Sequence, residues 1–171
     1  HDEGNLNWSF TIKRESDAQG FLWAYEYFGT LIAESLKALG VQAYFVKPNR
    51  IDVDGKKISG MAGHFKPRAF LIHGTLLVRS DLKLLNQICP PIAGAPPVTS
   101  LEEVLGWRVE VETVTRMILN FLSEKGIKIY QGELSPSESD LARNLYAQKY
   151  SLLTWNLGLL MTQTLTQQAL C

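Results

Sequence analysis

Cysteine is scarce in this chain, because Cys89 and Cys171 are the only two among 171 residues. Their positions fit neither a metal-ligand spacing nor the framework of a small disulfide-rich scaffold. The sequence therefore favours a reducing, cytoplasmic location.

Long apolar runs and an excess of one charge are also missing. No stretch approaches the roughly 20 apolar residues that a membrane-spanning helix requires. The opening residues HDEGN are polar and acidic, whereas a signal peptide starts basic and then becomes apolar. Lys plus Arg and Asp plus Glu number 17 each, so no overall field attracts nucleic acid or an anionic membrane. Any basic binding site must be local.

Several catalytic signatures are absent as well. The chain contains no Gly-x-Ser-x-Gly elbow, no Walker-type loop and no dinucleotide fingerprint. No second histidine or carboxylate stands at metal-ligand spacing from His73, so a zinc site is not expected. The chain starts at His1 rather than at Met. We therefore expect a processed chain or a piece of something longer.

The patterns that are present indicate one α+β (mixed α/β) domain over residues 1–171. Polar and apolar residues alternate from Asn5 to Ile12, which predicts a half-buried strand. Residues 22–39 carry apolar side chains at steps of three and four and are followed by Gly40, which predicts an amphipathic helix. The other expected elements are strands at 41–46, 70–78 and 127–130, a hairpin at 49–59, and helices at 80–88, 100–106, 111–125 and from Ser135. This order predicts a curved mixed β-sheet with packed helices.

The hairpin at 49–59 turns at Asp54-Gly55, a dipeptide suited to the positive φ values of a two-residue turn. The expected cross-strand pairs are Val53 with Lys56, Asp52 with Lys57, and Ile51 with Ile58. Lys57 and Ser59 would then share the face opposite the two isoleucines.

Lys57 runs directly into the small residues SGMAG at 59–63. A lysine there is a compact cation that could neutralise a carboxylate or phosphate, and the glycines leave backbone N–H groups free for oxyanions. The alternative is a solvated hairpin lysine facing Asp52, a surface pair worth about 0.2–1 kcal/mol. Spacing alone favours this second interpretation, because such hairpins are common.

Three other polar side chains are open to two interpretations. His73 lies in the run FLIHGTLLV, expected to be buried on both faces, where a histidine is usually a hydrogen-bonded core residue. Its neighbours Gly74 and Thr75 open space beside it. Asn5 and Asn7 share the polar face of the first strand, as edge-strand residues or as groups that help to hold a metal ion or phosphate.

Four segments together, in this order and spacing, resemble the lipoate-protein ligase family within the biotin/lipoate ligase fold: HDEGNLNWSF, NRIDVDGKKISGMAG, HGTLLV and TSLEEVLG. The resemblance runs from His1 to about residue 156, and GKKISG followed by HGTLL is its most specific part. It implies activation of lipoate with ATP and Mg²⁺ to lipoyl-adenylate. The lipoyl group would then pass to a lysine of a lipoyl carrier domain, of the 2-oxoacid dehydrogenase E2 or glycine cleavage H type.

The resemblance also implies roles for particular residues. Lys57 corresponds to the catalytic lysine that reaches the lipoyl carboxylate and the α-phosphate. Asn5 corresponds to an asparagine near the nucleotide phosphates and magnesium, and Asn49 to the asparagine before the hairpin. The remaining implied ligand contacts are Ser59, Gly60 and Ala62 against the nucleotide, and His73, Gly74 and Thr75 along the acyl pocket.

The chain departs from the family pattern in three respects. Arg50 stands where the family usually carries an aspartate. The family's motif R-R-x-S-G-G-G-A-V, which precedes H-D-x-G-N, is absent, as is the small carboxy-terminal accessory domain. The resemblance therefore implies an amino-terminal segment, on a second chain or cleaved from this one, and an accessory-domain protein as a further partner.

Alternative functions remain. Octanoyl or lipoyl transferases of this fold place a nucleophilic cysteine upstream of the hairpin, where residues 41–48 contain none and Cys89 lies too late. A biotin ligase fits the HGTLL segment less well. A non-catalytic paralogue that binds acylated carrier domains is supported by Arg50 and opposed by Lys57. Lipoate versus octanoate preference, oligomeric state and the role of residues 157–171 stay open.

Overall fold

The computed structural model describes residues 1–13 and 20–158. The chain divides into two compact units, His1–Ile129 and Tyr130–Cys171. The single domain expected over residues 1–171 stays a prediction. Within the described ranges, no helix is long and apolar enough to cross a membrane.

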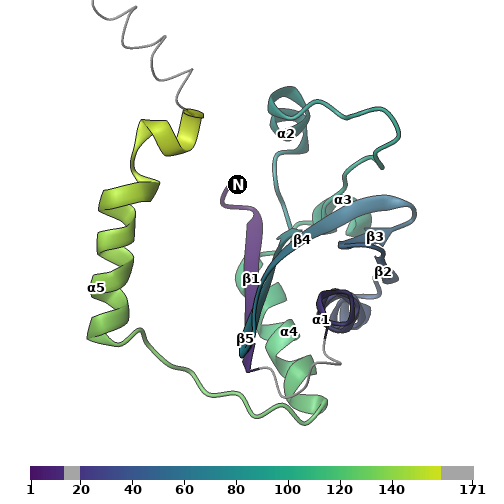
Figure 1. Ribbon diagram of the computed structural model, residues 1–171. Helices are drawn as coiled ribbons and strands as arrows, with labels where there is room; N and C mark the ends of the chain where they lie inside the picture. Colours follow the sequence, from purple (N-terminus) through teal and green to yellow (C-terminus); the bar gives the residue numbers. More distant parts are fainter. Residues whose placement is uncertain (14–19, 159–171) are drawn as a thin grey trace, which may run out of the picture. The chain divides into compact units, whose positions relative to one another are not determined.

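The first unit is built on a five-stranded sheet in the order β1-β5-β4-β3-β2 (Figure 1). Its strands are β1 Asn5–Lys13, β2 Ala43–Val46, β3 Arg50–Val53, β4 Lys56–Lys66 and β5 Ala69–Leu77. Every pairing between these strands is antiparallel. In the described part of the chain, the one parallel pairing is an isolated bridge between Lys57 and Val98. The α+β class is confirmed, with an antiparallel sheet where a mixed one was expected.

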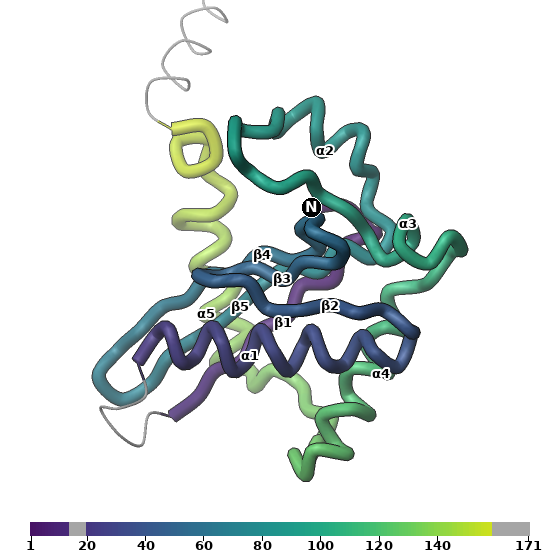
Figure 2. Tube along the Cα trace, turned by 90° about the vertical axis from the view of Figure 1, so that its right-hand side faces the viewer, coloured from purple at the N-terminus to yellow at the C-terminus, as the bar shows by residue number. Residues whose placement is uncertain are grey.

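One face of the sheet is covered by helices. They are α1 (Phe21–Ser35), its 3₁₀ continuation Leu36–Leu39, and α4 (Val111–Glu124). Gly40 ends this first helical segment at φ 76°, as predicted from the sequence. Figure 2 shows α1 and α4 on one side of the strands and α2 (Leu82–Ile88) with the following segment on the other. The short helix α3 (Leu101–Leu105) precedes α4.

The opposite face of the sheet is polar and open. In β5, Phe70, Ile72 and Leu76 are buried, whereas His73 is exposed and Thr75 half-buried. The expectation that this strand is buried on both faces is therefore wrong. An apolar run does not by itself distinguish burial on one face from burial on two, and β5 follows the alternation of a half-buried strand.

The hairpin between β3 and β4 contains a bulge that the sequence did not reveal. Val53 pairs with Lys56 and Asp52 with Lys57 as predicted, but Ile51 pairs with Ser59 rather than Ile58. The extra residue shifts the register at this point. As a result Ser59 is buried, together with Asp52, instead of sharing an open face with Lys57.

Two other local predictions concern the helix start at Ser100 and the strand at 127–130; the first is confirmed and the second is wrong. Ser100 Oγ accepts a hydrogen bond from Glu103 N–H (3.3 Å), as expected for a helix start, but the Glu103 carboxylate accepts from the Thr99 hydroxyl (3.0 Å). The strand expected at 127–130 is not formed. Instead, Ile127 N–H donates to the carbonyl of Leu122 and closes the end of α4.

The second unit, described over residues 130–158, contains α5 (Pro136–Leu145) and a π-helical turn at Tyr146–Tyr150. The helix α5 starts where it was predicted, with a complete capping box: Ser135 Oγ accepts from Glu138 N–H, and the Glu138 carboxylate accepts from Ser135 N–H. Hydrogen bonds from the Ser135 side chain and backbone lower the pKa of Glu138. Further along, Lys149 Nζ lies 4.1 Å from the centre of the Trp155 ring.

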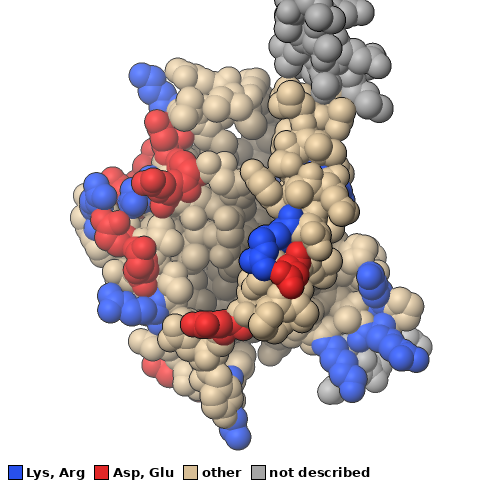
Figure 3. Space-filling view, turned by 90° about the vertical axis from the view of Figure 1, so that its left-hand side faces the viewer, with Lys and Arg blue, Asp and Glu red and all other residues tan. Residues whose placement is uncertain are grey.

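Charges are distributed without a dominant sign. On the face that Figure 3 displays, acidic and basic side chains lie side by side at the left edge and near the centre, and a basic group lies at the lower right. Wide areas carry neither sign. The view agrees with the balanced composition, and the site must be sought in local geometry.

Candidate functional site

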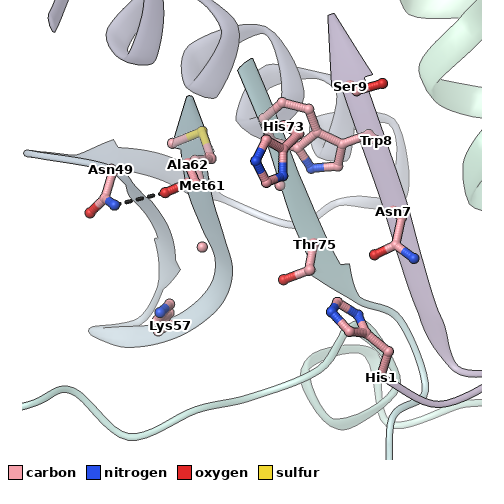
Figure 4. A pocket seen from close by; sticks show the side chains of 12 residues that line it. His1, Asn7, Trp8, Ser9, Asn49, Lys57, Met61, Ala62, His73 and Thr75 are labelled. Carbon is pink, nitrogen blue, oxygen red and sulfur yellow. Dashed lines mark hydrogen bonds between the residues drawn. The ribbon is translucent and has the colours of Figure 1, made fainter. Parts of the chain in front are cut away.

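Two adjoining cavities open on the polar face of the sheet, with volumes of about 670 and 680 Å³. Both are lined by His1, Asn49, Lys57 and Thr75, and we call them together the cleft. In Figure 4, Asn49 and Lys57 stand on one side, and Thr75, Asn7 and His1 on the other. Groups from β1, β4, β5 and the loop before β3 thus converge on one space.

The backbone of Lys57 is held by hydrogen bonds at both its N–H and its carbonyl group. Its N–H donates to the carbonyl of Pro97 (2.8 Å), and its carbonyl accepts from Thr99 N–H (2.9 Å). The proline-rich segment therefore anchors the start of β4 at the residue that carries the ammonium group. This anchoring restricts the backbone of Lys57 and therefore the point from which its side chain extends.

The Lys57 side chain lies over Gly60. A Cβ added to Gly60 would stand 3.0 Å from Lys57 Nζ. Among the described residues, no carboxylate forms an ion pair with this ammonium group. Asp52, its cross-strand neighbour, pairs with Arg50 instead, Arg50 Nε lying 3.1 Å from Asp52 Oδ1. The interpretation of Lys57 as one half of a surface pair with Asp52 is therefore wrong, and its charge is available to a ligand.

The two asparagines are already engaged by the protein. Asn49 Nδ2 donates to the carbonyl of Met61 (2.7 Å), which ties the loop before β3 to β4. Asn5 Nδ2 donates to Asn7 Oδ1 (2.9 Å) and lies 3.0 Å from His1 Nδ1. Both asparagines line the cleft, and ligand contacts from them would use their carbonyl oxygens.

The HGT segment of β5 divides between the two faces. His73 and Thr75 line the cleft; Thr75 is paired with Asn7 of β1 and Gly60 of β4. Gly74 also borders it, but a Cβ on Gly74 would meet Trp8 at 2.5 Å and the Gly60 carbonyl oxygen at 2.8 Å. Its small size therefore lets the strands and Trp8 pack closely.

Of the site residues predicted from the sequence, all but Ser59 line the cleft. They are Asn5, Asn49, Lys57, Gly60, Ala62, His73, Gly74 and Thr75. Ser59 is turned into the interior by the bulge, and its hydroxyl finds no hydrogen-bond partner in the described part of the chain. Their chemical roles stay predictions.

The sequence matches the lipoyl protein ligase A/B catalytic domain over residues 1–123. The chain belongs to this family.

The relatives of this lipoyl ligase family member include "Lipoate-protein ligase A subunit 1" of Thermoplasma acidophilum. The two are 27% identical over 94% of this chain and 68% of the relative. A "Putative lipoate-protein ligase A" of Aeropyrum pernix is 30% identical over 88% of this chain and 61% of its own length. The chain thus spans about two thirds of the length of these relatives.

Solved structures of lipoate-protein ligases are similar in fold to this chain. A bi-partite lipoate protein ligase from T. acidophilum, described with its E2 lipoyl domain, has a TM-score of 0.79 at 27% identity and covers 92% of this chain and 66% of its own. A lipoate-protein ligase A bound with ATP has a TM-score of 0.77 at 27% identity, over 92% of this chain and 67% of that one. A T. acidophilum protein with bound lipoic acid also reaches 0.77, at 26% identity over the same shares.

Some residues of the cleft were not predicted from the sequence. Ser9 lines it, and the alternation of β1 could have found Ser9, since it shares a face with Asn5 and Asn7. Arg50 and the apolar residues of α2 and of segment 90–97 also line it. The sequence carries no local signal that folds α2 over the cleft.

The described residues contain no ready cluster of metal ligands. No group of three or more His, Cys, Asp or Glu side chains suited to a metal occurs in the part that the structure describes. The two carboxylate oxygens of Asp2 accept from Gly4 N–H (3.0 Å) and Asp81 N–H (2.8 Å). Burial alone raises the pKa of Asp2, but the hydrogen bonds from the Asp81 and Gly4 backbone outweigh it and lower the pKa. Asn5 as a magnesium ligand stays a prediction.

Proposed function

We propose that the protein carrying this domain activates lipoate with ATP to lipoyl-adenylate and transfers the lipoyl group to a lysine of a lipoyl carrier domain. The observation that carries the proposal is the ammonium of Lys57, which has no carboxylate partner among the described residues, on an open cleft of a lipoyl protein ligase fold. The ATP-bound and lipoic-acid-bound relatives support the two substrates.

The chemistry brings two anions together. A carboxylate oxygen of lipoate attacks the α-phosphorus of ATP and pyrophosphate leaves; the amine of the carrier lysine then attacks the acyl carbonyl, AMP leaves, and the amine releases a proton. Lys57 is placed to offset the repulsion of the two anions and the charge that develops at phosphorus. The backbone near Gly60 and Ala62 and the side chains of His73 and Thr75 would border the substrates. Magnesium would enter with the nucleotide phosphates, which commonly hold it together with only one or two protein groups.

We also propose partners for this reaction. The acceptor is a lipoyl carrier domain of the E2 or H type, in keeping with the E2 lipoyl domain described with the T. acidophilum ligase. A segment bearing the glycine-rich motif, on the same or a second chain, and an accessory-domain protein would complete the enzyme. That relative is named a subunit and its structure bi-partite, which supports such an arrangement.

The test is lipoate-dependent exchange of pyrophosphate into ATP by the full-length protein, followed by mass measurement of a carrier domain. We expect exchange only when lipoate is present, and a lipoyl mass increment on the carrier lysine. Transfer of octanoyl or lipoyl groups between carriers without ATP would support the transferase alternative. Binding of acylated carrier with neither reaction would support the non-catalytic paralogue.

Gly60→Ala is expected to separate activity from stability. Its Cβ would press on the flexible end of Lys57 at 3.0 Å, so the ammonium moves while the sheet stays intact. Because small displacements of a catalytic group are costly, kcat/KM should fall about tenfold or more.

The matched control is Gly132→Ala, since nothing lies within 4 Å of a Cβ added at Gly132. Urea unfolding of the Gly60→Ala variant should remain within about 1 kcal/mol of the parent. Unchanged kinetics for Gly60→Ala would contradict the placement of the Lys57 ammonium over this glycine.

A further inference from the structure

Arg50 is a second cation beside Lys57. It lines the cavity that Lys57, Asn49 and Thr75 also line. Its Cα is paired across the ladder with Gly60, the residue over which the Lys57 ammonium lies. The backbone of Arg50 and the ammonium group of Lys57 therefore lie beside the same residue of β4, and both residues line one cavity of the cleft.

Arg50 is held in place by a buried carboxylate. Its Nε donates to both Asp52 Oδ1 and Asp52 Oδ2 at 3.1 Å. The Asp52 side chain is 3% exposed, whereas that of Arg50 is 33% exposed. In the described part of the chain, Nη1 and Nη2 of Arg50 have no hydrogen-bond partner. Asp52 thus occupies one edge of the guanidinium and leaves the other edge to the cleft.

A guanidinium fixed in this way suits an oxyanion. Its remaining N–H groups form a planar fork that matches two oxygens of a phosphate or carboxylate. Lys57 supplies a point charge on the same cavity, so the two cations differ in geometry and complement each other. Burying a pair such as Arg50–Asp52 contributes little to folding stability by comparison with apolar packing, which favours a role in orientation.

We propose that Arg50, positioned by Asp52, binds an oxyanion of the substrates, a nucleotide phosphate or the acyl carboxylate. The proposal rests on the proposed function and extends it with a second cationic group. It also gives the departure from aspartate at this position a chemical consequence, because this chain carries a cation there.

The test must remove the guanidinium without leaving Asp52 buried and unpaired. The double variant Arg50→Gln/Asp52→Asn removes both charges, Asp52→Asn alone keeps the guanidinium, and Arg68→Gln removes an exposed arginine in the turn at the far end of β4. Calorimetric titration of the full-length protein with Mg-ATP alone and with lipoate alone distinguishes the two sources of the oxyanion. Circular dichroism and urea unfolding establish that each variant is folded.

We expect the double variant to bind one of the two ligands roughly tenfold to a hundredfold more weakly, the loss of a charge-assisted hydrogen bond. Arg68→Gln should stay within about threefold of the parent, and Asp52→Asn, which keeps the guanidinium but loses the carboxylate that positions it, should bind with an affinity between those of the parent and the double variant. If the folded double variant binds both ligands as tightly as the parent, or if the parent binds neither, the proposal is overturned. If the parent binds but shows no lipoate-dependent exchange, the proposed function fails while the oxyanion site stands.

Discussion

Lys57→Ala is expected to lower lipoate-dependent pyrophosphate exchange by about 100- to 1000-fold, the range found when one preorganised donor to a developing anion is removed. The ammonium has no carboxylate partner among the described residues, so its charge is not needed to neutralise a buried group. The side chain is half-buried over Gly60 at the edge of the cleft. Activity should therefore fall without loss of the fold. Rates are measured with saturating ATP and lipoate, and stability by urea unfolding.

The matched control is Lys56→Ala, one residue earlier in β4. Lys56 is exposed and lines neither cavity of the cleft, so its removal alters the same hairpin and the same net charge without touching the site. Exchange by Lys56→Ala should remain within about twofold of the parent, as for an ordinary surface change. Equal losses in the two variants would show that hairpin charge, rather than a placed ammonium, matters. Full activity of Lys57→Ala would remove the basis of the proposed mechanism.

Periodic patterns predicted the elements that a single strand or helix determines. The alternation in β1 and the three-four spacing in α1 each report one buried face, and that face packs as expected. The bulge between β3 and β4 was not predicted from the sequence, because it depends on how the two strands fit around Asp52 and Ser59. No residue type announces it in advance.

The residues of the site were predicted from the family resemblance, but the geometry of the site was not predicted. The motifs indicated which residues gather, but they did not reveal that Gly60 makes room for the Lys57 ammonium or that segment 97–99 holds the Lys57 backbone. The Arg50–Asp52 pair had a usable signal, since residues two apart share a face of a strand. Contacts between distant segments had none, because they depend on tertiary packing.

The largest expected loss of stability comes from Phe70→Ala, at about 3–5 kcal/mol. Phe70 is 1% exposed and stacks on Phe65 of β4, with ring centroids 5.6 Å apart. It also meets Trp23 and Phe28 of α1 edge-on, at 6.2 and 6.3 Å. Truncation would leave a cavity where the sheet joins its helical layer, and these rings are too constrained to fill it.

The loss would reach the cleft, because β5 carries Phe70 on its buried face and His73 and Thr75 on the open one. The control is Phe21→Ala: Phe21 is 53% exposed and touches Tyr25 and Phe65 only edge-on, so it should cost about 1 kcal/mol or less. Urea unfolding followed by tryptophan fluorescence and circular dichroism measures both. Against a typical total of about 5–15 kcal/mol, the Phe70 variant should unfold at a much lower urea concentration. Similar midpoints for the two variants would mean that the aromatic layer between β5 and α1 does not hold the sheet to its helices.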